Sequence, residues 1–261
     1  MGNSQDMGHH FARVASVYGH VRDTDPDIIE EIIPRLPYDK SSSHVADIGC
    51  GTGRYSKIIA AKAKSHLQLF CCDYSVAMLQ QCRKQLSRYV PSGNTHYCLV
   101  NANDLPFGNT CFDAVTTFNA IHHFDLDYFV VTAVRVLRPG GLLSIYTRTP
   151  EQNTHTIWGR HFPGFSARET RLYRRERLKE VIESVMELQL EDIKEFNHVR
   201  VESPESLLNR AYNFHYSTFA LYPTNEFRSA LKQFARRLTE ISKEGKIEHT
   251  SRNTMVLARR I

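Results

Sequence analysis

The sequence predicts an α/β fold in which a mostly parallel sheet of seven strands is combined with helices. From about residue 43 to residue 148, short apolar runs alternate with helical patterns, which is typical of parallel strands joined by crossover helices. A glycine-rich turn follows the first of these runs. Two further strand-like segments lie later in the chain. These three observations together indicate the fold class.

Five segments of the central region have the length and composition of strands. They are residues 44–49, 67–73, 95–101, 112–118 and 141–147. Helical patterns lie between them at 55–63, 75–89 and 126–137. Ser75 is a suitable N-cap for the second of these helices, and Pro139-Gly140-Gly141 is expected to end the third.

The remaining segments are expected to complete a single domain, 1–261. We expect an N-terminal helical cap at 1–40, a cofactor-binding core at 41–148, helical insertions at 149–180 and 202–245, and a closing strand within 246–261. The first insertion contains a basic helical pattern at 168–185. The two late strand-like segments are 190–201 and 253–261. Additions of this kind often carry a substrate lid.

The composition is that of an ordinary soluble globular protein, with 41% apolar and 23% charged residues. No stretch approaches the roughly 20 apolar residues of a membrane span, and the polar N-terminus does not resemble a secretory signal, so we expect a cytoplasmic protein. The net charge of +5 permits a nucleic-acid partner without requiring one. The six cysteines lack paired metal-site spacing and are expected to fill the core, so no metal site is predicted.

The strongest motif follows the first predicted strand. An apolar run containing Asp47 leads into Gly49, Gly51 and Gly53, and a helical pattern follows. Glycine lets the backbone turn sharply and lets a ligand approach it closely. Dinucleotide-binding folds use the spacing G-x-G-x-x-G, whereas this loop has G-x-G-x-G after an acidic residue.

Asp73 ends the second predicted strand. A carboxylate at the tip of that strand can accept hydrogen bonds from both ribose hydroxyls of an adenosine. The alternative is an aspartate that only caps the following helix.

Further motifs follow at NANDLPF (101–107), FDAVTTFNAIHHF (112–124) and VLRPGG (136–141). With the glycine-rich loop, they resemble the Rossmann-like class I methyltransferases that use S-adenosylmethionine. The resemblance is greatest to the branch of the ubiquinone/menaquinone C-methyltransferases and trans-aconitate methyltransferase. It is dense over about 43–148 and nearly absent from residue 150 onward.

This resemblance implies a cofactor site for S-adenosylmethionine. The three glycines would surround the methionine end of the cofactor, next to Asp47, and Asp73 would hold its ribose. The residues implied in the other contacts are Tyr74 and Met78 beside the adenine, Asn101 and Ala102 at its amino group, and Phe118 and Asn119 beneath the sulfonium. Asn101 stands where the family usually has aspartate, but an asparagine carbonyl can also accept a hydrogen bond from the adenine amino group.

Four other residues are candidates for the site. His122 and His123 follow the fourth predicted strand, and His123 in particular could take a proton from the methyl acceptor; the alternative is packing against the sheet. Tyr18 and Arg22 lie in FARVASVYGHVR (11–22), which resembles the N-terminal helix that these methyltransferases fold over the cofactor. There, Tyr18 could face the sulfonium and Arg22 could pair with a carboxylate of the cofactor or the substrate. Ordinary amphipathic packing is the alternative for both.

The insertions leave two questions open. The basic run at 168–177 could form a solvated helix face with internal ion pairs or an anion-binding rim. The aromatic residues there could be core or could line an acceptor pocket. These residues are Trp158, Phe162, Phe165, Tyr212, Phe214, Tyr216 and Phe219.

The sequence therefore predicts a methyltransferase that acts on a small-molecule acceptor, which could be anionic or aromatic. Whether carbon, oxygen, nitrogen or sulfur is methylated stays open. One alternative is a tRNA enzyme that methylates a carboxymethyl group on the wobble uridine, because DIGCGTGRYS, CDYS and AIHHF resemble that family too. Against it, YTRTPEQN follows the glycines at 140–141 in place of that family's aromatic stretch. A non-catalytic scaffold that retains the cofactor fold is a third alternative.

Overall fold

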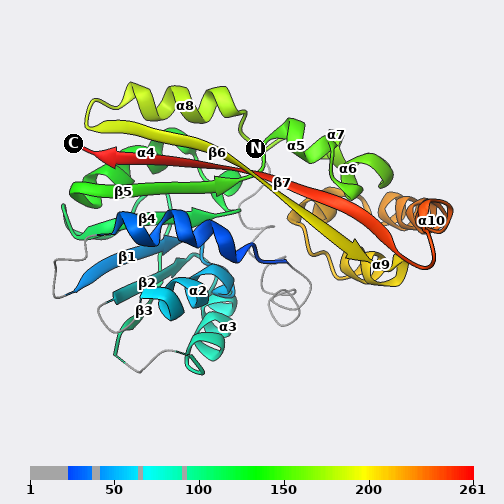
Figure 1. The fold of residues 1–261 in the computed structure, drawn as a ribbon, viewed down its shortest axis with the longest axis horizontal. Coiled ribbons are helices and arrows are strands. Elements are labelled where there is room, and N and C mark those ends of the chain that lie inside the picture. The colour runs from blue at the N-terminus through cyan, green and yellow to red at the C-terminus, as the bar shows by residue number, and fades with distance from the viewer. Residues whose placement is uncertain (1–22, 37–41, 64–66, 90–92) are drawn as a thin grey trace. The chain divides into compact units, whose positions relative to one another are not determined.

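The computed structural model describes residues 23–36, 42–63, 67–89 and 93–261 (Figure 1). Tyr18 and Arg22 lie outside these residues, so their roles stay predictions. The chain forms two compact units. The sheet unit comprises Thr24–Thr147, Arg175–Lys194 and Thr254–Ile261, and the helical unit comprises Arg148–Arg174 and Glu195–Asn253 together with Asp23.

A seven-stranded sheet, with the order β3-β2-β1-β4-β5-β7-β6, is formed by the described residues. The strands are β1 Ser43–Ile48, β2 Leu67–Asp73, β3 Thr95–Leu99, β4 Phe112–Phe118, β5 Leu137–Thr147, β6 Leu188–Glu202 and β7 Ile247–Arg260. The first five pair in parallel, and β7 pairs antiparallel to β5. The predicted fold class, a mostly parallel seven-stranded Rossmann-like sheet, is thus confirmed.

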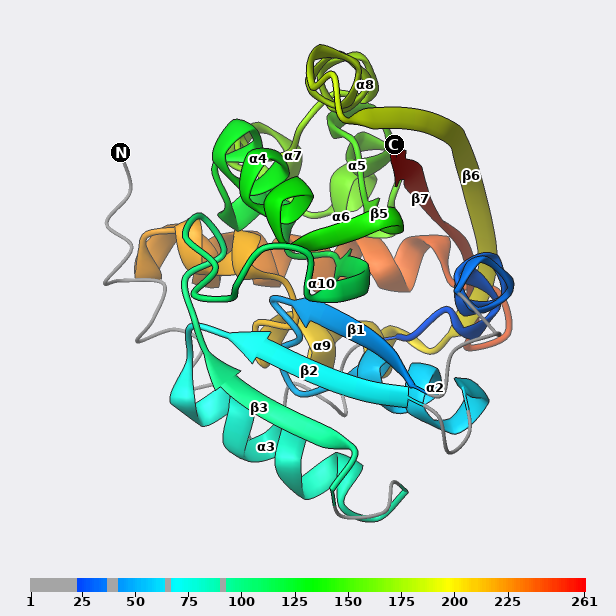
Figure 2. The same cartoon turned by 90° about the vertical axis from the view of Figure 1, so that its left-hand side faces the viewer.

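Helices connect the parallel strands as the alternating pattern predicts. They are α2 Arg54–Ala63, α3 Val76–Leu86 and α4 Leu126–Val136. Figure 2 shows β1, β2 and β3 side by side, with α3 packed along β2 and β3. The Ser75 side chain accepts a hydrogen bond from the Met78 amide at 3.4 Å, so the predicted N-cap is confirmed.

The turn at Pro139-Gly140-Gly141 does not end α4 as predicted. The helix ends at Val136, and Leu137 is already extended and pairs with Phe112 of β4. The next paired residue of β5 is Leu142, so the intervening residues bulge out of the ladder. Proline and glycine suit this bulge because proline cannot donate to the ladder and Gly140 has a positive φ of 76°.

The predicted basic helix at 168–185 is also divided. Its parts are α7 Phe165–Arg168 and α8 Arg175–Ser184. Between them, the buried carboxylate of Glu169 accepts hydrogen bonds from the backbone and side chain of Arg171 and from the Thr218 hydroxyl. These bonds hold the segment in a non-helical path. Within the run, Arg171 pairs with Glu169, and Arg168 pairs with Glu226 of the later helix at 224–241. An anion-binding rim at 168–177 stays a prediction.

The helical unit has an aromatic core. Its helices are α5 Pro150–Thr154, α6 Ile157–His161, α7, α9 Pro204–Tyr212, η5 Ser217–Leu221 and α10 Thr224–Ile241. Trp158, Phe162, Phe165 and Phe219 are buried together in it, whereas the Tyr212 side chain is 69% exposed. These four aromatic residues therefore belong to the core of the helical unit.

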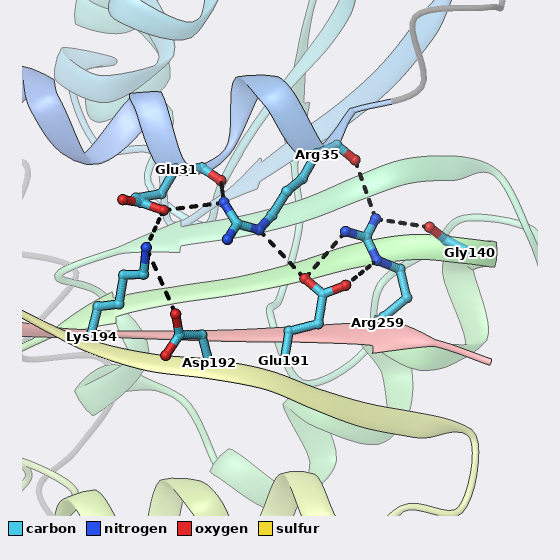
Figure 3. Close-up of polar contacts among 7 residues, drawn as sticks. All are labelled: Glu31, Arg35, Gly140, Glu191, Asp192, Lys194 and Arg259. Atoms are coloured by element: carbon cyan, nitrogen blue, oxygen red, sulfur yellow. Dashed lines mark hydrogen bonds and ion pairs between the residues drawn. The ribbon is translucent and has the colours of Figure 1, made fainter.

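An ion-pair network in the sheet unit joins the first described helices of the chain to its last strand. These are the short 3₁₀ helices η1 Pro26–Glu31 and η2 Ile33–Arg35. Glu191 of β6 forms two hydrogen-bonded ion contacts with Arg259 of β7, at 2.7 and 3.2 Å, and it also lies 3.5 Å from Arg35 (Figure 3). Lys194 reaches Glu31 at 2.7 Å, and Arg259 also donates to the carbonyls of Arg35 and Gly140.

The charges of this network depend on pH. Hydrogen bonding and charge from Lys194, followed by Arg35, hold the pKa of Glu31 below its ordinary value despite partial burial. A carboxyl group whose pKa is lower in the folded state stabilises the fold above its unfolded-state pKa. That stabilisation is lost as the pH falls through the lowered pKa.

Replacing Glu191 should test this network. Glu191→Gln removes the charge that faces Arg35 and Arg259 and should lower the free energy of unfolding by roughly 1 kcal/mol, an effect that added salt should reduce. Urea denaturation measures this change. Glu187→Gln is the matched control, because Glu187 is exposed and forms no ion pair within the described residues. Equal stabilities of the two variants would contradict the role of the network.

Candidate functional site

The glycine-rich loop connects β1 to α2, and all three of its predicted glycines have positive φ. The values are 70° at Gly49, 55° at Gly51 and 80° at Gly53. Side chains rarely adopt this backbone conformation, so the loop needs glycine at each position.

The surroundings of these glycines differ. A Cβ at Gly49 would lie 2.6 Å from the Ala120 Cβ, and one at Gly53 would lie 2.6 Å from the Cys82 Sγ. These two glycines therefore let neighbouring chain segments pack. A Cβ at Gly51 would meet no described protein atom within 4 Å. Gly51 is thus the position of the loop that faces open space.

Asp73 joins this loop to the start of α3. One carboxylate oxygen accepts a hydrogen bond from the Gly51 amide at 2.8 Å, and the other accepts from the Ser75 amide at 2.9 Å. Burial raises the pKa of Asp73, and these amide hydrogen bonds oppose that rise. Each oxygen retains further acceptor capacity. Asp73 therefore supports the loop and keeps acceptor positions for further donors.

Asp47 is a buried carboxyl group at the end of β1, with only 1% of its surface exposed. Its Oδ2 accepts a hydrogen bond from the Ser56 hydroxyl, whereas its Oδ1 has no hydrogen-bond partner among the described residues. Burial raises the pKa of Asp47 to about 8. An unsatisfied buried carboxyl oxygen is costly, so this group is suited to a donor that the chain itself does not supply.

The residues predicted beside the adenine lie on three neighbouring segments. Tyr74 follows β2 and is 45% exposed, while Met78 in α3 is 2% exposed. Asn101 is exposed, and its side-chain oxygen accepts a hydrogen bond from the Asn103 amide at 3.0 Å; Ala102 beside it is buried. The Asn101 oxygen keeps one further acceptor position. Their contacts with adenine stay predictions.

The residues predicted beneath the sulfonium lie at the end of β4. Phe118 is buried and stacks on Tyr55 with ring centroids 4.5 Å apart. Asn119 has a φ of 54°, and its amide donates to the Tyr146 carbonyl at 2.7 Å. A non-glycine residue in this conformation is uncommon and often marks a functional site.

A buried polar network beside Phe118 has no counterpart among the residues predicted from the sequence. The Tyr146 hydroxyl donates to the Asp25 carboxylate at 2.8 Å, and the Tyr55 hydroxyl lies 3.5 Å from the Asp25 amide. All three residues are at most 5% exposed. Tyr55 lies two residues after Gly53 and Tyr146 lies in the predicted strand 141–147, but no sequence signal connects either residue with Asp25.

His122 and His123 occupy the short helix η4, Ile121–His123. Their ring centroids are 4.1 Å apart, and both side chains are half-buried. A catalytic role for either histidine stays a prediction.

The described residues contain neither a membrane-spanning helix nor a cluster of metal ligands. No helix there is both long and apolar enough to span a membrane. Within the same residues, no group of three or more histidine, cysteine, aspartate or glutamate side chains could hold a metal ion.

Residues 46–145 match the family described as "Methyltransferase domain". Over 147 residues the chain is 33% identical to the probable tRNA methyltransferase 9B of Mus musculus; the match covers 53% of this chain and 30% of that protein. Over 144 residues it is 30% identical to the ubiquinone/menaquinone biosynthesis C-methyltransferase of Vibrio cholerae, which covers 52% of this chain and 54% of that protein.

Solved structures extend the similarity in fold. The geranyl diphosphate C-methyltransferase of Streptomyces coelicolor A3(2), crystallised with Mg²⁺, geranyl-S-thiolodiphosphate and S-adenosyl-L-homocysteine, matches with a TM-score of 0.57 at 15% identity. That match covers 90% of this chain and 76% of the other.

The matched family, the relatives and the shared fold agree with one another. The chain nonetheless spans only about a third to a half of the length of the two curated relatives. It contains a class I, S-adenosylmethionine-dependent methyltransferase domain, and it is related to the ubiquinone/menaquinone C-methyltransferases.

Proposed function

We propose that the chain transfers a methyl group from S-adenosylmethionine to a small-molecule acceptor. The observation that carries this proposal is the open space at Gly51, whose amide donates to the carboxylate of Asp73, together with the unsatisfied Oδ1 of Asp47 at the same edge of the sheet. Ligands of open α/β sheets bind at the carboxyl ends of the strands, where these three residues lie.

The polar groups around the loop suit the two ends of this cofactor. The methionine end carries an ammonium group, which could donate to the Oδ1 of Asp47 and would lower the raised pKa of that carboxyl group. The remaining acceptor positions of Asp73 suit the ribose hydroxyls. Phe118 and Asn119 would lie near the sulfonium, and an aromatic face attracts such a cation.

When bound, the cofactor supplies a methyl group that its positive sulfur already activates. The chain has to hold the acceptor in line with that methyl group and exclude water. The buried network of Asp25, Tyr55 and Tyr146 supports this role because it fixes the aromatic surface on which Phe118 stacks. A base is needed only for an acceptor that must lose a proton.

The names of two related proteins support a small-molecule acceptor. One acts in ubiquinone and menaquinone biosynthesis, and the other is a geranyl diphosphate methyltransferase. The methylated atom stays open between carbon, oxygen, nitrogen and sulfur. We also propose a cytoplasmic location, which the lack of a spanning helix in the described residues permits.

A second candidate function is methylation of tRNA. The observation that favours it is the 33% identity to probable tRNA methyltransferase 9B. Against it, the chain departs from the wobble-uridine enzymes after residue 141. A survey of methylated products that includes total tRNA separates the two functions: radioactive methyl transfer into tRNA would replace the small-molecule proposal.

The open space at Gly51 leads to a test of cofactor binding. Gly51→Val should abolish binding of S-adenosylmethionine measured by calorimetry, because its side chain would fill that space. Gly140→Val is the matched control, since Gly140 also has a positive φ and open surroundings but lies in the bulge of β5. Both variants carry the same backbone strain. Loss of binding in both, or in neither, would contradict the assignment.

Asp73 is expected to hold the ribose. Asp73→Ala should weaken S-adenosylmethionine binding by about 1.5–3 kcal/mol through the loss of charge-assisted hydrogen bonds. The change also removes the acceptor for the Gly51 and Ser75 amides, so Asp73→Asn, which keeps an acceptor, is measured beside it. Wild-type affinity in both variants would refute the assignment.

His123 is the candidate general base. His123→Ala should lower turnover by about 100-fold without changing cofactor affinity, and the acid limb of the pH–rate profile should disappear. His122→Ala is the control, because adjacent side chains of a short helix point in different directions. If both variants keep their activity, the acceptor reacts without a base, as an amine, a thiolate or a carboxylate would.

A further inference from the structure

A cavity of about 530 Å³ lies within the helical unit. Its lining comes from His155 and α6, from Val201 of β6, from the end of α10, and from the turn before β7 and the first residues of that strand. We propose that this cavity binds the phosphomonoester group of a small anionic ligand. This proposal does not depend on methyl transfer.

Unpaired positive charge is the first observation. Arg160, Lys243, Lys246 and Arg252 line the cavity, and Glu248 is the one acidic residue among its lining residues. In the part of the chain that the structure describes, none of the four basic side chains forms an ion pair.

Four other arginines of the same unit are neutralised. Arg168 pairs with Glu226, and Arg171 pairs with Glu169. Arg210 pairs with both Asp23 and Glu202, and Arg237 pairs with Glu240. Basic residues without an ion pair also occur elsewhere in the described part of this unit, so the feature specific to the cavity is that four of them line one concave region with a single acidic residue.

His161 reports the electrostatic potential of the cavity. Burial, followed by the charges of Arg237 and Arg160, lowers the pKa of His161. The Nε of Arg237 can only donate, and it lies 3.4 Å from the Nδ1 of His161, which must therefore accept. In the neutral ring the proton is then on Nε2, so His161 can add a neutral donor to the four cations.

The other two histidines of the lining are held by the protein. His155 Nδ1 lies 2.8 Å from the Glu151 carbonyl, and His249 Nε2 lies 3.0 Å from the Glu202 carboxylate. His161 is therefore the imidazole best placed to respond to an anion, and it can be followed by NMR.

The size and walls of the cavity favour a small ligand. Its volume falls within the range of small-molecule pockets, roughly 300–1,000 Å³. Ile157 and Ile247 are each 4% exposed and give it an apolar part, while the cations supply several N–H donors. A phosphomonoester has two negative charges and three acceptor oxygens that match such donors. A nucleic-acid backbone is more commonly bound on an extended basic surface.

Binding of inorganic phosphate and of adenosine 5′-monophosphate to the whole chain tests the proposal, with adenosine as the probe that lacks phosphate. In NMR titrations, both phosphates should raise the pKa of His161, because the bound anion offsets the charges of Arg237 and Arg160. Adenosine should leave it unchanged. No shift with either phosphate, or an equal shift with adenosine, would overturn the proposal.

Variants locate the site. The double change Lys243→Gln and Lys246→Gln should weaken phosphate binding about tenfold or more, and Arg160→Gln should also weaken it. The matched control is Lys232→Gln with Arg236→Gln, two exposed residues of α10 that do not line the cavity. Equal weakening in the control would show charge attraction without a site and would overturn the proposal. Binding of tRNA that depends on Lys243 and Lys246, without binding of either phosphate, would also overturn it, in favour of a nucleic-acid surface.

Discussion

Parallel pairing of β1 with β2 and β4 is the constraint on which the candidate site depends. The register places Ile48 beside Cys72 and Asp47 beside Thr116. Because parallel strands end at the same edge of a sheet, the loops after β1, β2 and β4 meet there. The hydrogen bond from the Gly51 amide to Asp73 then joins two of these loops directly. Without this register, the motifs of the sequence would remain separate.

This arrangement places two buried carboxyl groups close to a glycine loop. Burial raises the pKa of both Asp47 and Asp73, so keeping either group charged costs free energy in the folded chain. Asp73 recovers part of this cost through hydrogen bonds from two amides, but the Oδ1 of Asp47 has none among the described residues. An unsatisfied group of this kind is typical of a site that a ligand completes.

The helical unit differs from the sheet unit in its core and in the pairing of its charges. Its aromatic side chains form their own core around Trp158 and Phe162, and four of its arginines, Arg168, Arg171, Arg210 and Arg237, lie beside carboxylates. The four basic residues around the cavity form no ion pair within the described residues. What sets them apart from other basic residues of the unit is that they line one concave region, where like charges raise the local concentration of anions.

The sequence by itself determined the local parts of this protein. The strand that contains Asp47, the glycine turn, the following helix and the Ser75 cap are all patterns of neighbouring residues. Such patterns depend on backbone preferences and on the period of apolar residues. The cofactor class could be predicted for the same reason, because the glycines, Asp47 and Asp73 belong to short motifs.

Only the tertiary structure decided what depends on distant residues. It distinguished Gly51, which faces open space, from Gly49 and Gly53, which admit neighbouring segments. It brought Tyr146 to Asp25 across 121 positions of the chain, and it placed Arg160 in one cavity with Lys243. Residues that meet only after long loops close leave no periodic pattern in the sequence, because their pairing depends on how the whole chain packs.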